Sequence, residues 1–486
     1  MREILTLTVS TAAMLLVIVG LAQFVFWLKI GYSARRVGRN REQISRILVD
    51  VGVRERPQLI VGLIACLDEE TVIGRTVSHF LEQSESARVV VVDDGSSDAT
   101  AAVASSAGGD RVLVVERRPP DARQGKGPAL NAGFAALTSY VASTGVDPSS
   151  VVVCVMDADG ILSTGCLDAA LNLFSDPKIG GVQIPVEIRN RPLGRSDDRR
   201  PRWTRLLTIY QDYEFYALSA RQQVARGATG SVSLGGNGQF TRLSALLMVD
   251  EARPWSTSLT EDLDLAISLM TSGWELHCLP DHRVSQEGVE SMRKLLRQRT
   301  RWMQGHIMCS RRIAEVWRSP RVPLSASIEV ISYLSVPLGL ILPWSIVSIA
   351  NVPLTVGHLG RVGESPSPLG AKLAIVASWY LLSFFPHLIT GWFYWRSRAG
   401  ETSRLKAFLL AHGFVAYTFI TFAATWRAVA RIAKGEHGWV KTERIGAVSR
   451  SSSGPAPRRS SWLRSCWSSP VSVDRRLSSR LLNRWR

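Results

Sequence analysis

Cysteine is scarce in this 486-residue chain, and its placement excludes two kinds of stabilising site. The six cysteines are scattered, and no two of them have the Cys-x-x-Cys spacing of zinc ligands. The sequence therefore indicates neither a zinc site nor a disulfide framework. A reducing compartment such as the cytoplasm suits the central part of the chain.

Acidic residues are also in short supply. The chain has 41 Asp and Glu against 58 Lys and Arg, which gives a formal net charge of +17. An excess of basic charge occurs in nucleic-acid-binding proteins, and also in membrane proteins, which collect Lys and Arg at the cytoplasmic flanks of apolar segments. Here many of the basic residues flank apolar runs or lie in the tail. We therefore expect a lipid bilayer as a partner, and no nucleic acid.

Residues Ile4 to Ile30 form an almost uninterrupted apolar run. It is long enough to cross a bilayer core of about 30 Å. It exceeds the apolar core of a signal peptide, about 7–15 residues, and no small-residue cleavage site follows it. A basic cluster, Arg35 to Arg41, comes next. We expect residues 1–31 to form a transmembrane helix and the domain that follows to be cytoplasmic.

The chain becomes apolar again after Pro323. Three stretches have the composition of segments that span or enter a membrane: 328–356, 371–395 and 405–432. Pro337 and Pro343 predict that the first is bent, split or re-entrant. We expect residues 326–432 to hold the C-terminal segments of a multi-pass plasma-membrane protein. The basic region 449–486, rich in Ser and Pro, is expected to be a disordered cytoplasmic tail.

Short apolar runs alternate with helix-compatible segments between residues 58 and 313. Four of the runs have the composition of buried parallel strands: 59–66, 88–92, 111–115 and 151–156. This alternation predicts a doubly wound α/β sheet. Because ligands of such sheets bind beyond the carboxyl ends of the strands, the residues that follow each strand are candidate site residues.

Acidic residues follow two of the predicted strands. Asp93 and Asp94 predict either an ordinary capped turn or carboxylates that bind a base and a ribose. Asp157 and Asp159 supply hard oxygen ligands, which suit Mg²⁺ or Mn²⁺ beside a diphosphate. Two acidic strand ends in one sheet are a stronger signal than either alone.

A third acidic group, Thr260-Glu261-Asp262, follows a glycine-rich stretch at 235–238. One interpretation is the first turn of a helix, where the helix dipole favours negative charge. The other is a general base that faces an acceptor hydroxyl, with glycines that let the backbone approach a sugar closely.

Gln298, Arg301 and Trp302 lie in a basic stretch of helical character, 292–313. A basic amphipathic helix just ahead of an apolar segment is typical of an interfacial helix. Such a helix could also present Trp302 to a sugar and Arg301 to a diphosphate. The two interpretations are therefore compatible.

Taken in order, six elements of residues 58–313 resemble the family 2 glycosyltransferases of the GT-A fold, which include cellulose, hyaluronan and poly-N-acetylglucosamine synthases. The elements are Cys66-Leu67-Asp68-Glu69-Glu70, Asp93-Asp94-Gly95-Ser96, Gly125-Lys126-Gly127-Pro128-Ala129-Leu130-Asn131, Asp157-Ala158-Asp159, Thr260-Glu261-Asp262 and Gln298-Arg299-Thr300-Arg301-Trp302. In the first element, Leu67 and Asp68 replace an aromatic residue and an asparagine that are usual in the family. Within 433–448, residues 439–442 are similar to a segment that closes over the nucleotide in some of these synthases.

The resemblance implies a GT-A α/β domain with transmembrane helices, and a role for each candidate residue. The donor-binding residues would be Glu69, Asp93, Asp94, Lys126 and Asp157. Asp159 would hold Mg²⁺ or Mn²⁺, and Asp262 would be the catalytic base. The acceptor and diphosphate side would be lined by Glu261, Gln298, Arg301 and Trp302.

The function implied by the resemblance is inverting transfer of a sugar from a UDP-sugar donor to a growing β-linked polysaccharide at the cytoplasmic face of the membrane. The same catalytic core also fits transfer of a single sugar to a lipid-linked acceptor. A third alternative, from a different class, is a catalytically inactive membrane scaffold.

Overall fold

The computed structural model describes residues 36–47, 55–192, 199–346, 348–349, 369–398 and 400–436. The transmembrane helix expected at 1–31 and the tail expected at 449–486 lie outside these residues. So does all of the segment 433–448 beyond residue 436.

Within the described residues, seven strands form one mixed sheet in the order β3-β2-β1-β4-β8-β6-β9. The first four strands in that order are parallel, whereas β8 runs antiparallel to both β4 and β6. A smaller sheet has the order β5-β10-β7. The main strands are β1 (Leu59–Cys66), β2 (Ala87–Asp93), β3 (Val112–Glu116), β4 (Val151–Met156), β6 (Ile179–Gln183), β8 (Gln239–Arg242) and β9 (Glu275–Cys278), and the smaller ones are β5 (Ile161–Leu162), β7 (Val186–Ile188) and β10 (Val284–Gln286).

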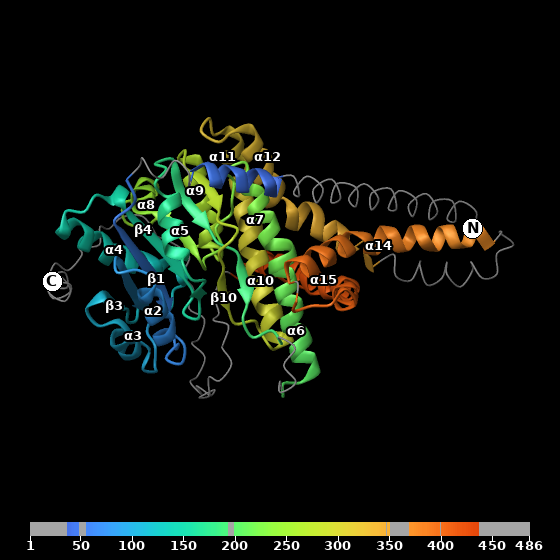
Figure 1. The fold of residues 1–486 in the computed structure, drawn as a ribbon, viewed down its shortest axis with the longest axis horizontal. Helices are drawn as coiled ribbons and strands as arrows, with labels where there is room; N and C mark the ends of the chain where they lie inside the picture. Colours follow the sequence, from blue (N-terminus) through green and yellow to red (C-terminus); the bar gives the residue numbers. More distant parts are fainter. Residues whose placement is uncertain are drawn as a thin grey trace.

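Helices cover both faces of the main sheet, which gives three layers (Figure 1). Successive strand residues point to opposite faces, so Val61 and Leu63 pack on the side of α4, while Ile60 and Ile64 pack on the side of α2. The helices of these layers are α2 (Ile73–Glu82), α3 (Thr100–Gly108), α4 (Lys126–Thr144), α5 (Cys166–Leu173), α8 (Leu243–Val249) and α9 (Glu261–Thr271).

The α/β fold and the four predicted strands are confirmed, with bounds that differ by at most one residue. The four predicted strands are parallel, as expected, but the sheet as a whole is mixed, because β8 inserts between β4 and β6 in the opposite direction. Its sequence, Gln-Phe-Thr-Arg, has no apolar run, yet all four residues are buried. Pairing on both sides satisfies their backbone groups, and this pairing is a tertiary feature.

A second group of helices lies beside the three layers of the α/β domain. One long helical path contains α6 (Arg202–Tyr213), a π-helical turn η4 (Glu214–Ser219) and α7 (Ala220–Gly227). The other helices of this group come later in the chain, after β10, and are α10 (Met292–Cys309), the 3₁₀ turn η5 (Ser310–Arg312) and α11 (Ile313–Arg318). The basic stretch 292–313 is therefore helical, as predicted, with a tightened turn near its end.

The apolar C-terminal region is helical where it is described. It contains α12 (Leu324–Leu334), a π-helical turn η6 (Val336–Ile341), α14 (Leu369–Ser397) and α15 (Arg404–Ala433). Helices 324–334 and 336–346 meet at an angle of 53°, close to Pro337, so the predicted bend is confirmed. By length and composition, α15 is the one described helix suited to crossing a membrane, and the bent pair could be a second crossing.

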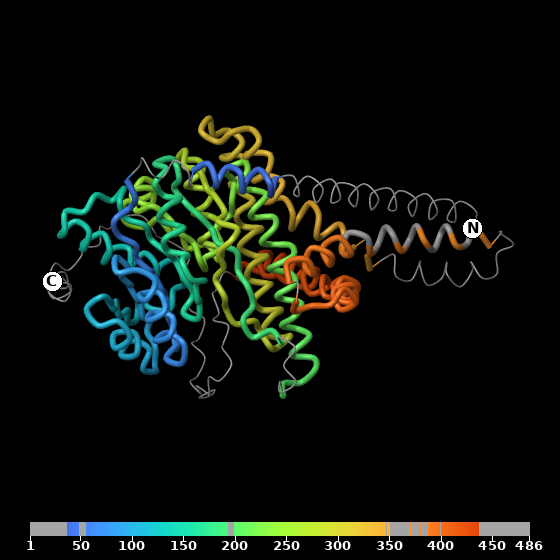
Figure 2. Tube along the Cα trace, in the orientation of Figure 1, coloured from blue at the N-terminus to red at the C-terminus, as the bar shows by residue number. Residues whose placement is uncertain are grey.

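The C-terminal helices are fixed to the rest of the fold by buried contacts. The carboxylate of Asp212 is fully buried and accepts from the Arg398 guanidinium at 2.9 Å and from the Tyr394 hydroxyl at 2.8 Å. Residues 36–47 form a helix beside α12 and α7 (Figure 2), and Arg36 pairs with Glu329 of α12 at 2.8 Å. The apolar helices and the α/β domain thus form one packed body.

Candidate active site

One cavity of about 720 Å³ opens at the carboxyl ends of β1 and β4. Strand-end residues such as Glu69, Asp94 and Asp157 line one end, and Asp262 lies along its length. The same cavity is also lined by residues of α10 and by Tyr333 and Ile341 of the C-terminal region. This position agrees with the rule that ligands bind beyond the carboxyl ends of parallel strands.

The strand-end acids of β1 and β2 have different roles. Asp94 lines the cavity and forms an ion pair with Arg117, and burial raises its pKa. Asp93 is not in the cavity wall; its Oδ1 accepts the backbone N–H of Ser96 at 2.9 Å and so fixes the turn. Glu69 is buried in the cavity wall.

Asp68 is one of the two residues by which the chain departs from the family pattern. It has a positive φ of 51°, and its Oδ1 accepts the backbone N–H of Ser97 at 2.7 Å. The residue therefore joins the loop after β1 to the loop after β2. This structural role had no signal in the sequence beyond the departure itself.

Asp157 and Asp159 lie together in the cavity wall after β4. The Asp157 Oδ1 accepts from the Lys126 ammonium at 2.6 Å, and the Asp159 Oδ2 accepts from the backbone N–H of Glu287 at 2.8 Å. The Asn237 side chain accepts the N–H of Asp157 at 3.2 Å, which fixes this corner further. Both carboxylates are thus held in place by named partners.

The donor set at this corner fits a hard divalent cation. Mg²⁺ prefers oxygen ligands in an octahedron and is commonly bound by one or two carboxylates plus phosphate oxygens and water. Within the described residues no cluster of three or more His, Cys, Asp or Glu is arranged to hold an ion. Asp157 and Asp159 are the two carboxylates at this corner that could serve as protein ligands of such an ion.

Asp262 begins the helix α9 together with Glu261, and both line the cavity. Burial raises the pKa of Asp262, while the cations Lys126 and Arg301 act in the opposite direction. Burial and the nearby Asp262 raise the pKa of Glu261 to about 7. A carboxylate of raised pKa in a cavity is suited to accept a proton at neutral pH.

Gly236 brings the glycine-rich loop directly against this acid. It has a positive φ of 64°, and a Cβ there would lie 2.9 Å from the Asp262 Oδ2 and 3.2 Å from the Lys126 Nζ. Only glycine fits both the backbone conformation and the space. Gly235 and Asn237 of the same loop line the cavity.

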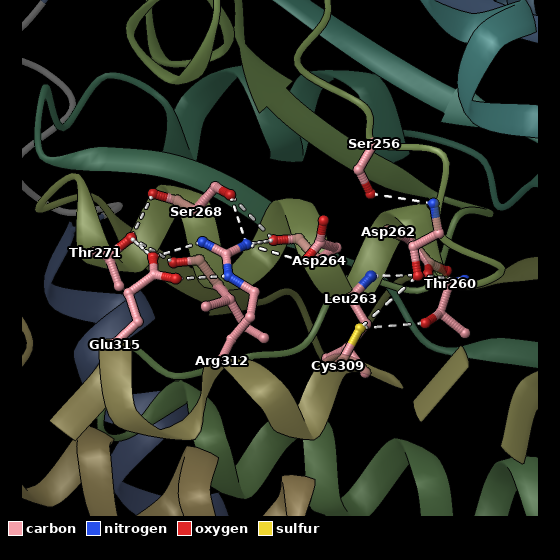
Figure 3. Close-up of polar contacts among 12 residues, drawn as sticks. Ser256, Thr260, Asp262, Leu263, Asp264, Ser268, Thr271, Cys309, Arg312 and Glu315 are labelled. Carbon is pink, nitrogen blue, oxygen red and sulfur yellow. Dashed lines mark hydrogen bonds and ion pairs between the residues drawn. The ribbon is translucent and has the colours of Figure 1, made fainter. Parts of the chain in front are cut away.

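Helix α9 is docked onto the end of α10 and the turn after it, as Figure 3 shows. The Cys309 Sγ lies 3.5 Å from the Thr260 hydroxyl, just before the acids. The Arg312 guanidinium donates to the Asp264 carboxylate at 3.0 Å and to the Ser268 hydroxyl at 2.8 Å. These contacts fix the position of Asp262 relative to α10.

The cavity-facing side of α10 carries Gln298, Arg301 and Trp302. Among the described residues, the buried Arg301 Nε finds no hydrogen-bond partner, which suits a ligand oxygen. Trp302 packs edge-to-face against Phe215 of the π-helical turn, with ring centroids 6.1 Å apart. Three of the four predicted acceptor-side residues therefore lie on one wall, and the fourth, Glu261, lines the same cavity from α9.

Sequence reasoning missed the residues that hold this wall in place. The Glu214 carboxylate accepts from the Arg299 guanidinium at 2.6 Å and from the Tyr417 hydroxyl of α15 at 2.9 Å. The Arg299 guanidinium in turn lies 4.1 Å from the centroid of the Trp302 ring. Helix interruptions of the π type often mark functional sites, but no local pattern of residues predicts this one.

Residues 57–305, about half of the chain, match the family described as glycosyltransferase-like family 2. The chain is 33% identical over 208 residues to a beta-monoglucosyldiacylglycerol synthase of Synechocystis sp., covering 42% of this chain and 37% of that protein. A synthase of the same name from Trichormus variabilis is 31% identical over 194 residues, covering 40% and 36%. The match thus spans little more than a third of the length of these relatives.

Among solved structures, the mannosyltransferase PcManGT from Pyrobaculum calidifontis, in complex with GDP-Man and Mn²⁺, superposes with a TM-score of 0.50 at 16% identity. The match covers 85% of this chain and 99% of that one. At this identity the likeness shows the fold alone, a GT-A-like nucleotide-sugar transferase fold. The resemblance to cellulose and hyaluronan synthases stays a prediction.

Proposed function

The chain belongs to glycosyltransferase family 2, and on that premise we propose that it transfers one sugar from a UDP-sugar to the hydroxyl of a membrane lipid. The observation that carries the reaction is the juxtaposition of Lys126, Asp157 and Asp262 in one cavity. The similarity to two monoglucosyldiacylglycerol synthases supports a lipid acceptor over the growing polysaccharide.

Asp262 is the general base of the proposed reaction. It takes the proton of the acceptor hydroxyl as that oxygen forms a bond to the anomeric carbon. The bond from the anomeric carbon to the diphosphate oxygen breaks, UDP leaves with the bonding electrons, and the anomeric configuration inverts. Arg301 faces the cavity where it can stabilise the charge on the leaving diphosphate.

Asp159 and Asp157 would hold a divalent cation beside the diphosphate. The carboxylate chemistry of this corner fits Mg²⁺ or Mn²⁺. When bound, the ion supplies neutralisation of the negative charge that develops on the leaving group. Lys126 balances the carboxylates from the other side, since its ammonium contacts Asp157.

Exposed apolar side chains support placement at a membrane. Helix α12 exposes 56% of Ile328, η6 exposes 44% of Leu338, and α15 exposes 59% of Leu409. Large contiguous apolar surface is unusual on proteins that contact water alone. We propose that these helices contact lipid and that the cavity faces the cytoplasm.

The test is a transfer assay with the full chain in nanodiscs that contain dioleoylglycerol. Radiolabelled UDP-glucose, UDP-galactose and UDP-N-acetylglucosamine are supplied in turn with Mg²⁺ or Mn²⁺, and the products are separated by thin-layer chromatography. We expect one lipid product that carries a single sugar. A long polymer would overturn the lipid proposal and favour polysaccharide synthesis.

A matched pair of variants tests the catalytic assignment. Asp262→Asn keeps the size of the side chain but removes the base, so transfer should fall by about 10²-fold or more. Asp110→Asn, at an exposed position outside the cavity, should leave transfer at the wild-type rate. Equal rates in the two variants would overturn the role of Asp262.

A further inference from the structure

The part of the cavity wall that comes from α10, α12 and the π-helical turn η6 differs in chemistry from the part at the strand ends. We call this part the distal subsite and define it by Met303, His306, Tyr333, Val336 and Ile341. The strand-end carboxylates, Asp262 and the distal subsite line the same continuous space.

The His306 side chain at the distal subsite is engaged with Tyr333. The His306 Nε2 lies 2.9 Å from the backbone oxygen of Tyr333, and the two rings are tilted by 47° with centroids 4.4 Å apart. Burial lowers the pKa of His306 to about 4, so the ring is neutral at physiological pH. The Arg226 guanidinium lies 3.6 Å from the centroid of the Tyr333 ring and pairs with Glu329 at 3.7 Å.

The remaining wall offers hydrocarbon to a ligand. Met303, Val336 and Ile341 contribute apolar side chains, which gain free energy from contact with another apolar group. A sugar needs hydrogen-bond partners for its hydroxyls, because a buried polar group without a partner is costly. The distal subsite therefore suits an acyl chain better than a second sugar residue.

The elements that line the distal subsite also carry apolar side chains on the outside of the protein. Leu338 of η6 is 44% exposed and Ile328 of α12 is 56% exposed. The subsite also lies at the 53° bend between helices 324–334 and 336–346. A hydrocarbon chain that leaves the subsite here would pass from one apolar environment to another.

From this geometry we propose that the distal subsite binds the first part of an acyl chain of the lipid acceptor while its hydroxyl lies at Asp262. The proposal rests on the proposed lipid acceptor and adds where its apolar part binds. The cavity thus becomes a single path, with the nucleotide at one end and hydrocarbon at the other.

The test compares acceptors that share a headgroup and differ in chain length. Dioleoylglycerol and dihexanoylglycerol are supplied separately to the full chain in the same detergent, with UDP-glucose and Mn²⁺. Ile341→Trp fills the distal subsite, and Leu338→Trp adds the same bulk three residues earlier, outside the cavity. The measured quantity is the ratio of kcat/KM for the long acceptor to kcat/KM for the short one.

We expect Ile341→Trp to lower this ratio by about tenfold or more, because a long chain loses apolar contacts that a short one never makes. Leu338→Trp should keep the wild-type ratio. Ile341→Ala provides a second variant without added bulk, and it should change the ratio as well. A thermal shift with UDP shows that each variant is folded at the donor end.

Three results would overturn the proposal, and they differ in whether they also contradict the lipid acceptor. If the wild type transfers sugar to both lipids and Ile341→Trp leaves the ratio unchanged, the distal subsite is contradicted but the lipid acceptor is not. Equal effects of Ile341→Trp and Leu338→Trp lead to the same conclusion. If the wild type elongates a glycan and forms no lipid product, the lipid acceptor and the distal subsite are both contradicted.

Discussion

The Lys126 ammonium lies 2.6 Å from the Asp157 Oδ1 and 2.8 Å from the carbonyl oxygen of Gly236. It joins the first residue of α4 to the end of β4 and to the glycine-rich loop. The carboxylates of Asp157, Glu261 and Asp262 raise the pKa of Lys126 against the opposing effect of burial. The cation and the acids around it therefore form one electrostatic unit.

Lys126→Met should slow sugar transfer, because it removes the cation from this electrostatic unit. Loss of the cation makes ionisation of Asp262 harder, because Lys126 favours its charged form. We expect kcat/KM at neutral pH to fall by about tenfold or more, with partial recovery at higher pH. Lys178→Met, at an exposed position, is the control. An equal loss at all pH values would contradict the electrostatic explanation.

The acids at the start of α9 predict a pH dependence. Both pKa values are raised, so kcat/KM should begin to fall at a higher pH than it would with an ordinary aspartate, as Asp262 takes up a proton. Glu261→Gln removes a neighbouring negative charge and should shift this acidic limb to lower pH. The measurement is a profile of kcat/KM from about pH 5 to about pH 9.

The raised pKa of Glu261 also makes the stability of the folded state depend on pH in a defined direction. A raised pKa means that the folded state binds more protons than the unfolded state between the ordinary value of 4.5 and about 7 for Glu261. Its contribution to stability is present below 4.5 and is lost as pH rises through about 7. Glu261→Gln should therefore gain in melting temperature relative to the wild type as pH rises. A constant difference between the two proteins would contradict the shift.

Arg312 holds α9 at the end of α10 through Asp264. Arg312→Gln leaves the Asp264 carboxylate buried without its cation, which should cost about 3 kcal/mol in the free energy of unfolding. A small displacement of Asp262 should also lower kcat by about tenfold. Urea unfolding and kcat are measured beside Arg311→Gln, an exposed neighbour that should behave as the wild type. A stable variant with normal kcat would show that the contact positions nothing.

The Tyr417 hydroxyl connects α15 to the acceptor wall. Tyr417→Phe removes its hydrogen bond to Glu214 and loosens the Arg299 side chain that stacks on Trp302. We expect the KM for the lipid acceptor to rise by about threefold to tenfold, with the KM for the UDP-sugar unchanged. Tyr380→Phe removes a hydrogen bond to His412, neither of which lines the cavity, and serves as the control. Equal changes in both KM values would indicate a general loss of structure.

The proposed cation site has a readout other than turnover. In Asp159→Asn the amide oxygen can still accept from Glu287, but the ligand charge is lost. We expect Mn²⁺ to increase the affinity of UDP for the wild type and to have a much smaller effect in this variant, measured by isothermal titration calorimetry. Asp168→Asn, which is exposed, should respond as the wild type. Equal responses would exclude Asp159 as the ligand.

Some of the site could be predicted because its signals are local. An apolar run such as Val151–Met156 is stable only as a buried strand, and acids that directly follow it must lie at the edge of the sheet. Asp157, Asp159 and Asp94 therefore lie in the cavity as predicted. Asp93 shows the limit of this reasoning. It precedes Asp94 by one residue, yet its carboxylate accepts the N–H of Ser96 instead of lining the cavity.

The sequence by itself determined the α/β domain, the acidic strand ends and the apolar C-terminal helices, because periodicity and composition report local burial. The tertiary structure alone decided which distant residues share the cavity. Glu214 meets Tyr417 across 203 positions of the chain, and Tyr333 meets His306 where three helices converge. Such contacts depend on how helices pack, and no local pattern of residues encodes that packing.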